Sequence, residues 1–571
     1  MYPEEKYMPR VQKKPSVNIC NLDICESNNE KKEFFKSLDM NYCEDVISLL
    51  MPILPLKYRG KTCTLDTGYK LLKWSASESL NIGTLSVQKN SETMDVSVYQ
   101  KKIPLIDPFQ WLKYKETSVL PFDWNKQNKE VLDPENQAYI DTLGSSLVSK
   151  LSTLYNSPHF CKFYGCFRAV ENVYKYDLSD DLEDIRFTNW FWSAIDEKEF
   201  VLNMVEKSSG RALTLDEIKE LMKPDDEYLE DSDSESGSDS QESRDSDTSE
   251  SNSSMETPNT VHDLEEVSLD DKSVDSDTII LKKKTSNHSS INSDYSNDSV
   301  YDDYDIYVEI QNMPVVVMYI EKCQGTLDEL IDNENAPADT FEKEVLWCAW
   351  LFQIIAALCQ LQGDLRLTHN DLHTNNVLWK TTTEEFLYYK DSLGRSWKVP
   401  TYGRIFTIID YGRAIFSINN FFCISSDYQD GNNAAGQYNF GPLEDFDEPK
   451  VLPNKNFDLS RLACSLVRGL YPYNPAAKEG GAIITKEKGW IVRETNHPLF
   501  NLLWTWLKSK NGENILEKED GREKFPGFDL YIEIAHNVND ALPRLQFAHP
   551  AMKQFLVPTL PLGANTIKIP L

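Results

Sequence analysis

The stretch THNDLHTNNVLWK (residues 368–380) places two histidines, one aspartate and three asparagines directly before an apolar segment. Within it, Asp371 is followed five positions later by Asn376. Further along the chain, FTIIDYGRA (406–414) ends an apolar, strand-like run on Asp410. Phosphoryl transfer from ATP needs a carboxylate that accepts a proton and hard oxygen ligands that hold Mg²⁺. The two stretches together supply both kinds of group.

The spacing is similar to the protein kinase pattern HRDxxxxN followed by DFG, and that resemblance implies a role for each polar side chain. Asp371 is predicted to be the base that receives the proton of the attacking hydroxyl, and Asn376 and Asp410 are predicted to be Mg²⁺ ligands. His369 is expected to support the backbone near Asp410. The alternative is a purely structural loop, in which Asn and Asp cap turns and the histidine satisfies a core carbonyl. The second strand, ending in Asp-Tyr-Gly, favours the catalytic interpretation.

On these motifs the chain resembles the eukaryotic protein kinase superfamily over roughly residues 60–550. Within that superfamily it is similar to haspin-type kinases and to divergent Ser/Thr kinases of large nucleocytoplasmic DNA viruses. The resemblance is carried by HNDLHTNNVLW, with His373 two positions after Asp371, and by LYYKDSLGRSWKVPTYGRIFTIIDYG (387–412) and IEKCQGTLDEL (320–330). It implies an α+β, bilobal fold with an antiparallel sheet plus a helix in the N-lobe and a mainly helical C-lobe.

The resemblance also implies a nucleotide-binding lysine within VSVYQKKIPL (96–105). Lys101 fits the family pattern, and Lys102 is the close alternative. Only one of them can face the nucleotide, because successive side chains on a strand point to opposite faces. The acidic partner of this lysine on the following helix is either Glu135 or Asp141.

Three more residues follow from the resemblance. Gly83 is the single glycine of NIGTLSVQK (81–89), where the family has three, so the phosphate cradle is expected to be weak. Glu321 is expected at the hinge, where backbone groups pair with adenine. Asp458, in NFDLSRLACSL, is expected to anchor the backbone of the catalytic loop, the alternative being an ordinary acid at a helix N-terminus.

Some positions depart from the family pattern. Asn370 stands where the family has the Arg that pairs with a phosphorylated activation loop, so activation by loop phosphorylation is not expected. His373 replaces a lysine near the transferring phosphate, where it could donate a hydrogen bond and would carry charge only with a raised pKa. No Ala-Pro-Glu motif occurs between Asp410 and Asp458.

The pattern of strands, helices and charge divides the 571 residues into five parts. Strand-like alternation dominates early and helical periodicity late. The expected parts are an N-terminal extension (1–55), the first part of the N-lobe with an ordered insertion (56–223), a disordered acidic Ser-rich insertion (224–303), the end of the N-lobe with the hinge (304–322), and the C-lobe (323–571).

The acid is concentrated in the insertion. Pro224 to Asp277 holds 20 Asp plus Glu and 2 Lys plus Arg, so this segment carries 20 − 2 = 18 of the 32 net negative charges. Low hydrophobicity with high like charge predicts disorder. We expect the segment to recruit basic protein partners, the alternative being a solvating spacer. Direct nucleic-acid binding and membrane binding are not expected of so acidic a chain.

Location is indicated only indirectly. The N-terminus shows no secretory signal, and eleven scattered cysteines without a CxxC pair predict reduced thiols in a cytoplasmic compartment, or in a host cytoplasm or virion if the viral resemblance holds. The apolar run VLWCAWLFQIIAALCQL (345–361) contains two glutamines and directly precedes the polar loop. It therefore predicts a buried core helix rather than a membrane span.

The expected activity is ATP- and Mg²⁺-dependent transfer of the γ-phosphate to Ser/Thr hydroxyls of protein substrates. Two alternatives stay open. HNDLHTNN is also similar to the HGDLHxGN loop of aminoglycoside and choline kinases, which favours a small-molecule phosphotransferase. The poor glycine loop and the unassigned acidic partner favour a nucleotide-binding pseudokinase scaffold.

Overall fold

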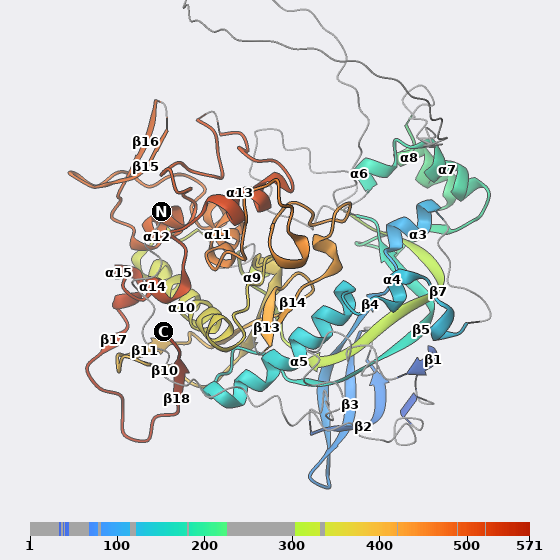
Figure 1. The fold of residues 1–571 in the computed structure, drawn as a ribbon, viewed down its shortest axis with the longest axis horizontal. Helices are drawn as coiled ribbons and strands as arrows, with labels where there is room; N and C mark the ends of the chain where they lie inside the picture. Colours follow the sequence, from blue (N-terminus) through green and yellow to red (C-terminus); the bar gives the residue numbers. More distant parts are fainter. Residues whose placement is uncertain are drawn as a thin grey trace, which may run out of the picture.

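The computed structural model describes residues 34–35, 38, 40–44, 68–77, 81–114, 122–179, 182–224, 303–331, 337–418, 421–487, 489–519 and 521–571. The expected N-terminal extension and acidic insertion therefore lie mostly outside the described residues. The described chain combines antiparallel sheets with helices, so the predicted α+β class is confirmed (Figure 1).

The largest sheet has seven antiparallel strands in the order β1-β5-β7-β4-β3-β2, and β6 pairs with β7 as well. Its centre is β7, whose first half pairs with β6 and whose second half pairs with β4, while β5 runs along its other edge. The run from Val315 to Tyr319 is fully buried, which explains its unbroken apolar sequence. The strands are β1 (Met40–Glu44), β2 (Lys70–Ala76), β3 (Ile82–Lys89), β4 (Glu92–Pro104), β5 (Phe163–Asp177), β6 (Val201–Glu206) and β7 (Tyr304–Glu321).

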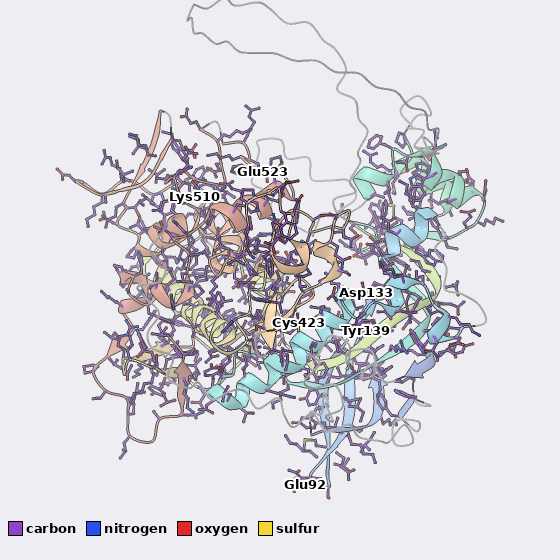
Figure 2. All side chains as sticks on the ribbon, viewed as in Figure 1. Glu92, Asp133, Tyr139, Cys423, Lys510 and Glu523 are labelled. Carbon is purple, nitrogen blue, oxygen red and sulfur yellow. The ribbon has the colours of Figure 1, made fainter. Side chains whose placement is uncertain are left out.

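The expected strands in 84–89 and 95–102 correspond to β3 and β4, and their hairpin turn ends in the exposed Glu92 at the edge of the molecule (Figure 2). The ordered insertion after residue 171 contributes β6 to this sheet, a strand that the sequence analysis missed. Short helices flank the sheet: α3 (Pro108–Tyr114), α4 (Lys129–Leu132), α6 (Leu182–Ile185), α7 (Asn189–Asp196) and α8 (Leu215–Met222).

One long helix, α5 (Gln137–Tyr155), packs against β5 and β7 and lies between the sheet and the C-terminal part of the chain (Figure 1). Its start is capped by the side chain of Asn136, which accepts the Ala138 N–H at 2.9 Å. Its end is Asn156, in the left-handed conformation that terminates helices. Most of the helix is buried, so its polar residues are placed at an internal junction.

The C-terminal part is built around α10 (Phe341–Asp364), as the sequence predicted. Within the described residues α10 is the one helix long and apolar enough to cross a membrane, and 89% of its apolar window is buried inside the protein. The two glutamines of the apolar run 345–361 are used internally. Gln353 bonds the backbone of Arg404 and Phe406, and Gln360 donates to the Lys568 carbonyl at 2.7 Å.

Helices and small sheets surround α10. The helices are α9 (Leu327–Leu330), α11 (Phe457–Leu470), α12 (Pro498–Trp506), α13 (Asp529–Asn537), α14 (Pro543–Gln546) and α15 (Pro550–Lys553). One sheet has the order β12-β9-β8 and another β17-β11-β10-β18. Their strands are β8 (Gly325–Thr326), β9 (Val377–Thr381), β10 (Phe386–Asp391), β11 (Ser396–Pro400), β12 (Arg404–Ile408), β17 (Leu556–Val557) and β18 (Thr566–Ile569).

The C-terminal part contains short strands that were not expected in a mainly helical late region. The hairpin β15 (Ile483–Glu487) with β16 (Trp490–Arg493) lies between α11 and α12, and β17 and β18 complete a sheet with β10 and β11. A second hairpin, β13 (Phe416–Ile418) with β14 (Phe421–Cys423), follows β12. These strands are short, and strands of two to five residues leave little periodicity to detect.

Candidate functional site

A cavity of ≈ 470 Å³ lies between the main sheet, α5 and the β12-β9-β8 sheet. Part of its wall is apolar, formed by Ile82, Val148, Met318, Ile320, Leu378 and Ile408. Of the residues predicted from sequence, Lys101, Glu321, Asp410 and the helix acid Asp141 line it. Gly83, Asp371, His373 and Asn376 are not among its lining residues.

Lys101, on β4, joins two carboxylates from distant segments. Its Nζ lies 2.7 Å from Asp141 Oδ2 on α5 and 3.1 Å from Asp410 Oδ2, which follows β12. The other oxygen of Asp141 accepts the backbone N–H of Tyr411 at 2.8 Å. A sheet, a helix and the Asp-Tyr-Gly turn therefore meet at one ion-paired cluster.

Lys101 and Asp410 favour each other's charged forms, whereas the charged form of Asp141 is disfavoured. Burial alone would lower the pKa of Lys101, but Asp141 and Asp410 outweigh it and raise that pKa, so the ammonium stays charged. Burial raises the pKa of Asp141 against the opposing effect of Lys101. For Asp410, the charge of Lys101 outweighs burial and lowers the pKa.

The structure decides between Lys101 and Lys102, and between Glu135 and Asp141. Lys102 points to the other face of β4, where its Nζ lies 2.7 Å from Glu171 Oε1. Glu135 precedes α5 and accepts from the Gln429 side chain at 3.4 Å. Lys101 and Asp141 are therefore the pair at the cavity.

Asp371 and Asn376 lie on the loop beside this cluster. Asn376 Nδ2 donates to the Asp371 carbonyl at 2.8 Å and to His373 Nε2 at 3.1 Å, which uses both of its hydrogens. The Asn376 carbonyl accepts the N–H of Ile409 at 3.1 Å, directly before Asp410. The loop and the Asp-Tyr-Gly turn are thus held side by side by the backbone.

His373 is neutral at ordinary pH. Burial lowers its pKa to about 4, and the nearby carboxylates of Asp371 and Asp410 oppose this effect without overcoming it. A neutral ring is also what the bond from Asn376 requires, since Nε2 acts there as an acceptor. The histidine therefore orients Asn376 and brings no positive charge to the site.

Hydrogen bonds to other elements hold the backbone of the loop that contains His369 and Asn370. The fully buried Asp458, on α11, accepts the N–H groups of His369 and Asn370 on one oxygen, each at 3.0 Å. His369 Nε2 lies 2.8 Å from the Ile409 carbonyl. The predictions that Asp458 anchors the loop and that His369 supports the backbone near Asp410 are confirmed.

Asn370 ties the loop to the segment that follows Asp410. Its side-chain nitrogen donates to the Arg413 carbonyl at 3.1 Å, and its oxygen accepts the Tyr438 hydroxyl at 2.7 Å. Asn370 and Asp410 both have positive φ, +61° and +67°. Asn and Asp are the non-glycine residues that adopt this left-handed conformation most readily, so both positions suit their residue types.

Sequence reasoning missed Tyr531, on α13. Its hydroxyl donates to Asp371 Oδ1 at 2.7 Å and accepts from Arg461 Nε at 3.1 Å. The guanidinium of Arg413 lies 5.7 Å from the centre of the Tyr531 ring. No motif links residues 371 and 531, so only the folded chain reveals the contact.

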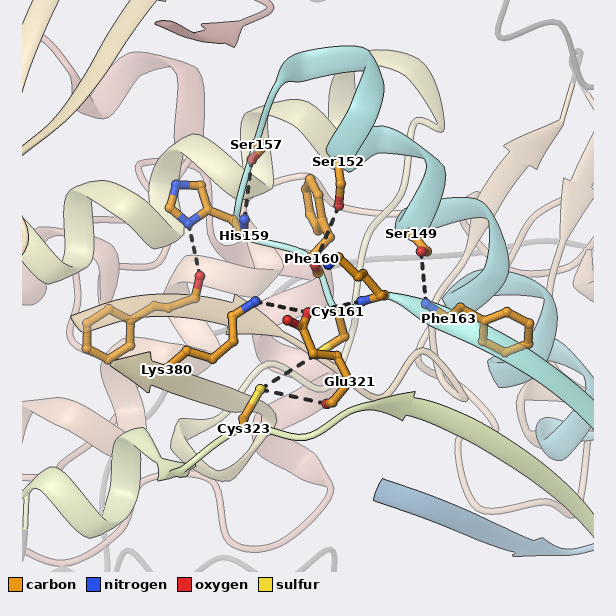
Figure 3. Close-up of polar contacts among 12 residues, drawn as sticks. Ser149, Ser152, Ser157, His159, Phe160, Cys161, Phe163, Glu321, Cys323 and Lys380 are labelled. Atoms are coloured by element: carbon orange, nitrogen blue, oxygen red, sulfur yellow. Dashed lines mark hydrogen bonds and ion pairs between the residues drawn. The ribbon is translucent and has the colours of Figure 1, made fainter. Parts of the chain in front are cut away.

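The opposite rim of the cavity carries a second polar group (Figure 3). Glu321 ends β7, and its Oε2 lies 3.1 Å from Lys380 Nζ on β9. Close by, Cys161 Sγ and Cys323 Sγ lie 3.8 Å apart. Glu321 was predicted at the hinge beside the nucleotide, and it lines the cavity; its ion pair with Lys380 and the two nearby thiols were not predicted.

Gly83 has a packing role. A Cβ at this position of β3 would lie 2.3 Å from the Ser75 carbonyl oxygen on β2. The neighbouring strand therefore explains why glycine is needed. The predicted contact of Gly83 with phosphates stays a prediction without support among the described residues.

The donor set fits a magnesium ion only in company with phosphates. The described residues contain no group of three or more His, Cys, Asp or Glu that could hold a metal alone. Asp410 is 41% exposed at its side chain, and no hydrogen bond within the described residues uses Asn376 Oδ1. Mg²⁺ is commonly held by one or two such protein oxygens, with phosphate and water oxygens completing the shell.

No protein-family model matches this sequence, and a search of curated proteins finds no match. The functional interpretation therefore rests on the residues and their geometry.

Proposed function

We propose that this chain is an ATP- and Mg²⁺-dependent protein kinase that transfers the γ-phosphate to Ser/Thr hydroxyls of protein substrates, on a bilobal kinase-like fold. The observation that carries this proposal is the cluster of Lys101, Asp141 and Asp410 next to the loop of Asp371 and Asn376. An isolated HxD loop would not require a half-buried lysine and a helix acid at the same place.

One end of the cavity suits the base of a nucleotide, and the other end suits its phosphates. Its apolar wall, bordered by the backbone from Glu321 to Gln324, suits a flat heterocyclic base. Its charged end presents the Lys101 ammonium, which would contact phosphate oxygens. Asn376 Oδ1 and the Asp410 carboxylate would hold Mg²⁺, which neutralises phosphate charge when bound.

Asp371 would act on the protein substrate. Its Oδ1 is engaged by Tyr531, which leaves Oδ2 to orient the attacking hydroxyl and accept its proton. Because His373 is neutral, Lys101 would supply positive charge to the phosphates. This argues for strong dependence of the reaction on Lys101 and on the metal.

The test is transfer of radiolabel from MgATP to a panel containing basic proteins, amino alcohols and sugars. Wild-type protein should label the proteins, and Asp371→Ala and Asp410→Ala should each reduce labelling at least about 10²-fold. Asp216→Ala, at an exposed acid on α8, is the matched control. Labelling of the small molecules alone would favour the small-molecule phosphotransferase. Absence of all transfer by the wild type, or full transfer by both variants, would reject the proposal.

A further inference from the structure

Two thiols meet at the cavity rim although they lie 162 residues apart in the chain. Cys161 precedes β5, Cys323 follows β7, and their sulfur atoms are 3.8 Å apart. The backbone holds the two segments together, because the Glu321 N–H donates to the Lys162 carbonyl at 2.9 Å. The Lys162 N–H in turn donates to Glu321 Oε2 at 3.3 Å. Figure 3 shows both thiols beside Glu321 and Lys380.

Both thiols are accessible to small molecules. Each is half-buried, and each lines the ≈ 470 Å³ cavity. By contrast, Cys348, Cys359 and Cys423 are buried in the core. Access through the cavity therefore separates this pair from the core cysteines.

A cation stands beside both thiols. The ammonium of Lys380 acts to lower the pKa of Cys161 and of Cys323, against the effect of burial. Either sulfur can be the donor in their contact. Burial raises the pKa of Cys348, Cys359 and Cys423 in the core. Since the thiolate is the nucleophile, the pair at the cavity is more reactive than these core thiols.

We propose that Cys161 and Cys323 form a redox modification site, at which a hydroperoxide oxidises one of the two thiols and the other then closes a disulfide. The first thiolate attacks one oxygen of hydrogen peroxide, the O–O bond breaks, and the products are a sulfenic acid and, after proton uptake, water. The second thiol then displaces the sulfenic oxygen as a second water. Two thiols lose two electrons in total, and the peroxide gains them. The proposal does not depend on phosphoryl transfer.

The geometry permits the second step. An S–S bond of about 2.05 Å requires the two sulfur atoms to approach by about 1.8 Å from their present separation. Side-chain rotation toward the partner is open to both residues because they border the cavity. The paired backbone keeps the two segments in place during closure.

The chain offers a direct measurement. Trypsin cleaves after Lys150, Lys162, Lys322 and Lys343, so Cys161 and Cys323 fall alone in peptides 151–162 and 323–343. Folded full-length protein is treated with a slight excess of hydrogen peroxide, alkylated and digested. We expect the two peptides linked, 2 Da lighter than their sum, in most molecules, and separated by reductant. Linkage should drop severalfold when the same treatment is given in 8 M urea.

Single substitutions test the pairing. In Cys161→Ser and in Cys323→Ser, the disulfide cannot close, so a sulfenic acid formed on the remaining cysteine should persist and add dimedone in at least one of the two variants. Cys423→Ser, at a buried core thiol, is the matched control and should leave the linked yield unchanged. A pair of peptides that stays unlinked in the folded protein, or links equally in urea, would overturn the proposal.

Discussion

At the scale of single residues, the carboxylate of Asp371 depends on a hydroxyl 160 positions away in the chain. Tyr531 donates to Oδ1 and is itself fixed by Arg461. Hydrogen bonds to charged groups contribute about 1.5–3 kcal/mol. Tyr531 is therefore a positioning residue for Asp371 in the proposed reaction.

Tyr531→Phe removes only the hydroxyl. We expect kcat to fall about tenfold or more, with KM for ATP unchanged, because Asp371 is less well oriented while the nucleotide cavity is untouched. Steady-state kinetics at varied ATP measures both quantities. Tyr155→Phe, which breaks another tyrosine–carboxylate bond, to Asp364, is the control and should keep kcat. Equal losses of kcat in both variants would show a general structural effect instead.

His159 ties the chain before β5 to the C-terminal part, and it is fully buried between the Phe406 carbonyl, at 2.9 Å, and the Tyr389 hydroxyl, at 2.8 Å. Burial lowers its pKa from 6.5 to about 4. The unfolded chain therefore binds a proton at higher pH than the folded chain, so stability falls as pH falls from about 6.5 to about 4. The difference corresponds to on the order of 3 kcal/mol.

His159→Gln should therefore lower the free energy of unfolding at pH 7 and make it depend less on pH between 6.5 and 4. Urea unfolding at a series of pH values measures both effects. His536→Gln, at an exposed histidine, should keep the wild-type slope. A wild-type slope in His159→Gln would contradict the expectation.

At the scale of elements, α5 connects the sheet to the Asp-Tyr-Gly turn. It carries Asp141, and one turn later Gly144 lies against Tyr411, where an added Cβ would be 2.7 Å from Tyr411 Cβ. Glycine in a helix interior costs roughly 0.5–1 kcal/mol relative to alanine. The close approach of Tyr411 is the reason to accept that cost.

Gly144→Ala should destabilise the protein by about 1–2 kcal/mol despite the better helix propensity, because overpacking outweighs it. The shift of Tyr411 should also weaken its bond to Asp141 and raise KM for ATP. Urea unfolding and kinetics measure the two effects. Thr153→Ala, on the exposed face of the same helix, should be neutral or slightly stabilising. Stabilisation by Gly144→Ala would disprove the close packing.

At the scale of the whole molecule, the residues on either side of the acidic segment belong to one sheet. Glu206 of β6 pairs with Tyr304 of β7. Between them in the chain, the N-terminus of α8 is capped by a capping box that Thr214 and Glu217 form. The described strands on either side of the acidic segment therefore pair directly with each other.

Replacing residues 225–302 by a Gly/Ser linker of about 20 residues should leave Tm within a few degrees of wild type. Capture of a small basic protein on immobilised chain should decrease at low salt, and the difference should vanish at high salt because charges are screened. A linker of equal length with alternating Glu and Ser is the control and should restore capture. Unchanged capture with the Gly/Ser linker would mean that the segment is only a spacer.

The sequence determined the local parts of the candidate site: the spacing of Asp371 and Asn376, the strand that ends at Asp410, the strand that bears two lysines and the buried helix α10. These are patterns within a few turns or one strand, so residue order alone encodes them. Only the tertiary structure decided between Lys101 and Lys102 and between Glu135 and Asp141, and only it brought Tyr531 to Asp371 and Cys161 to Cys323. Each depends on which face of an element packs against a segment far away in the chain, and that choice is made by burial across the whole core.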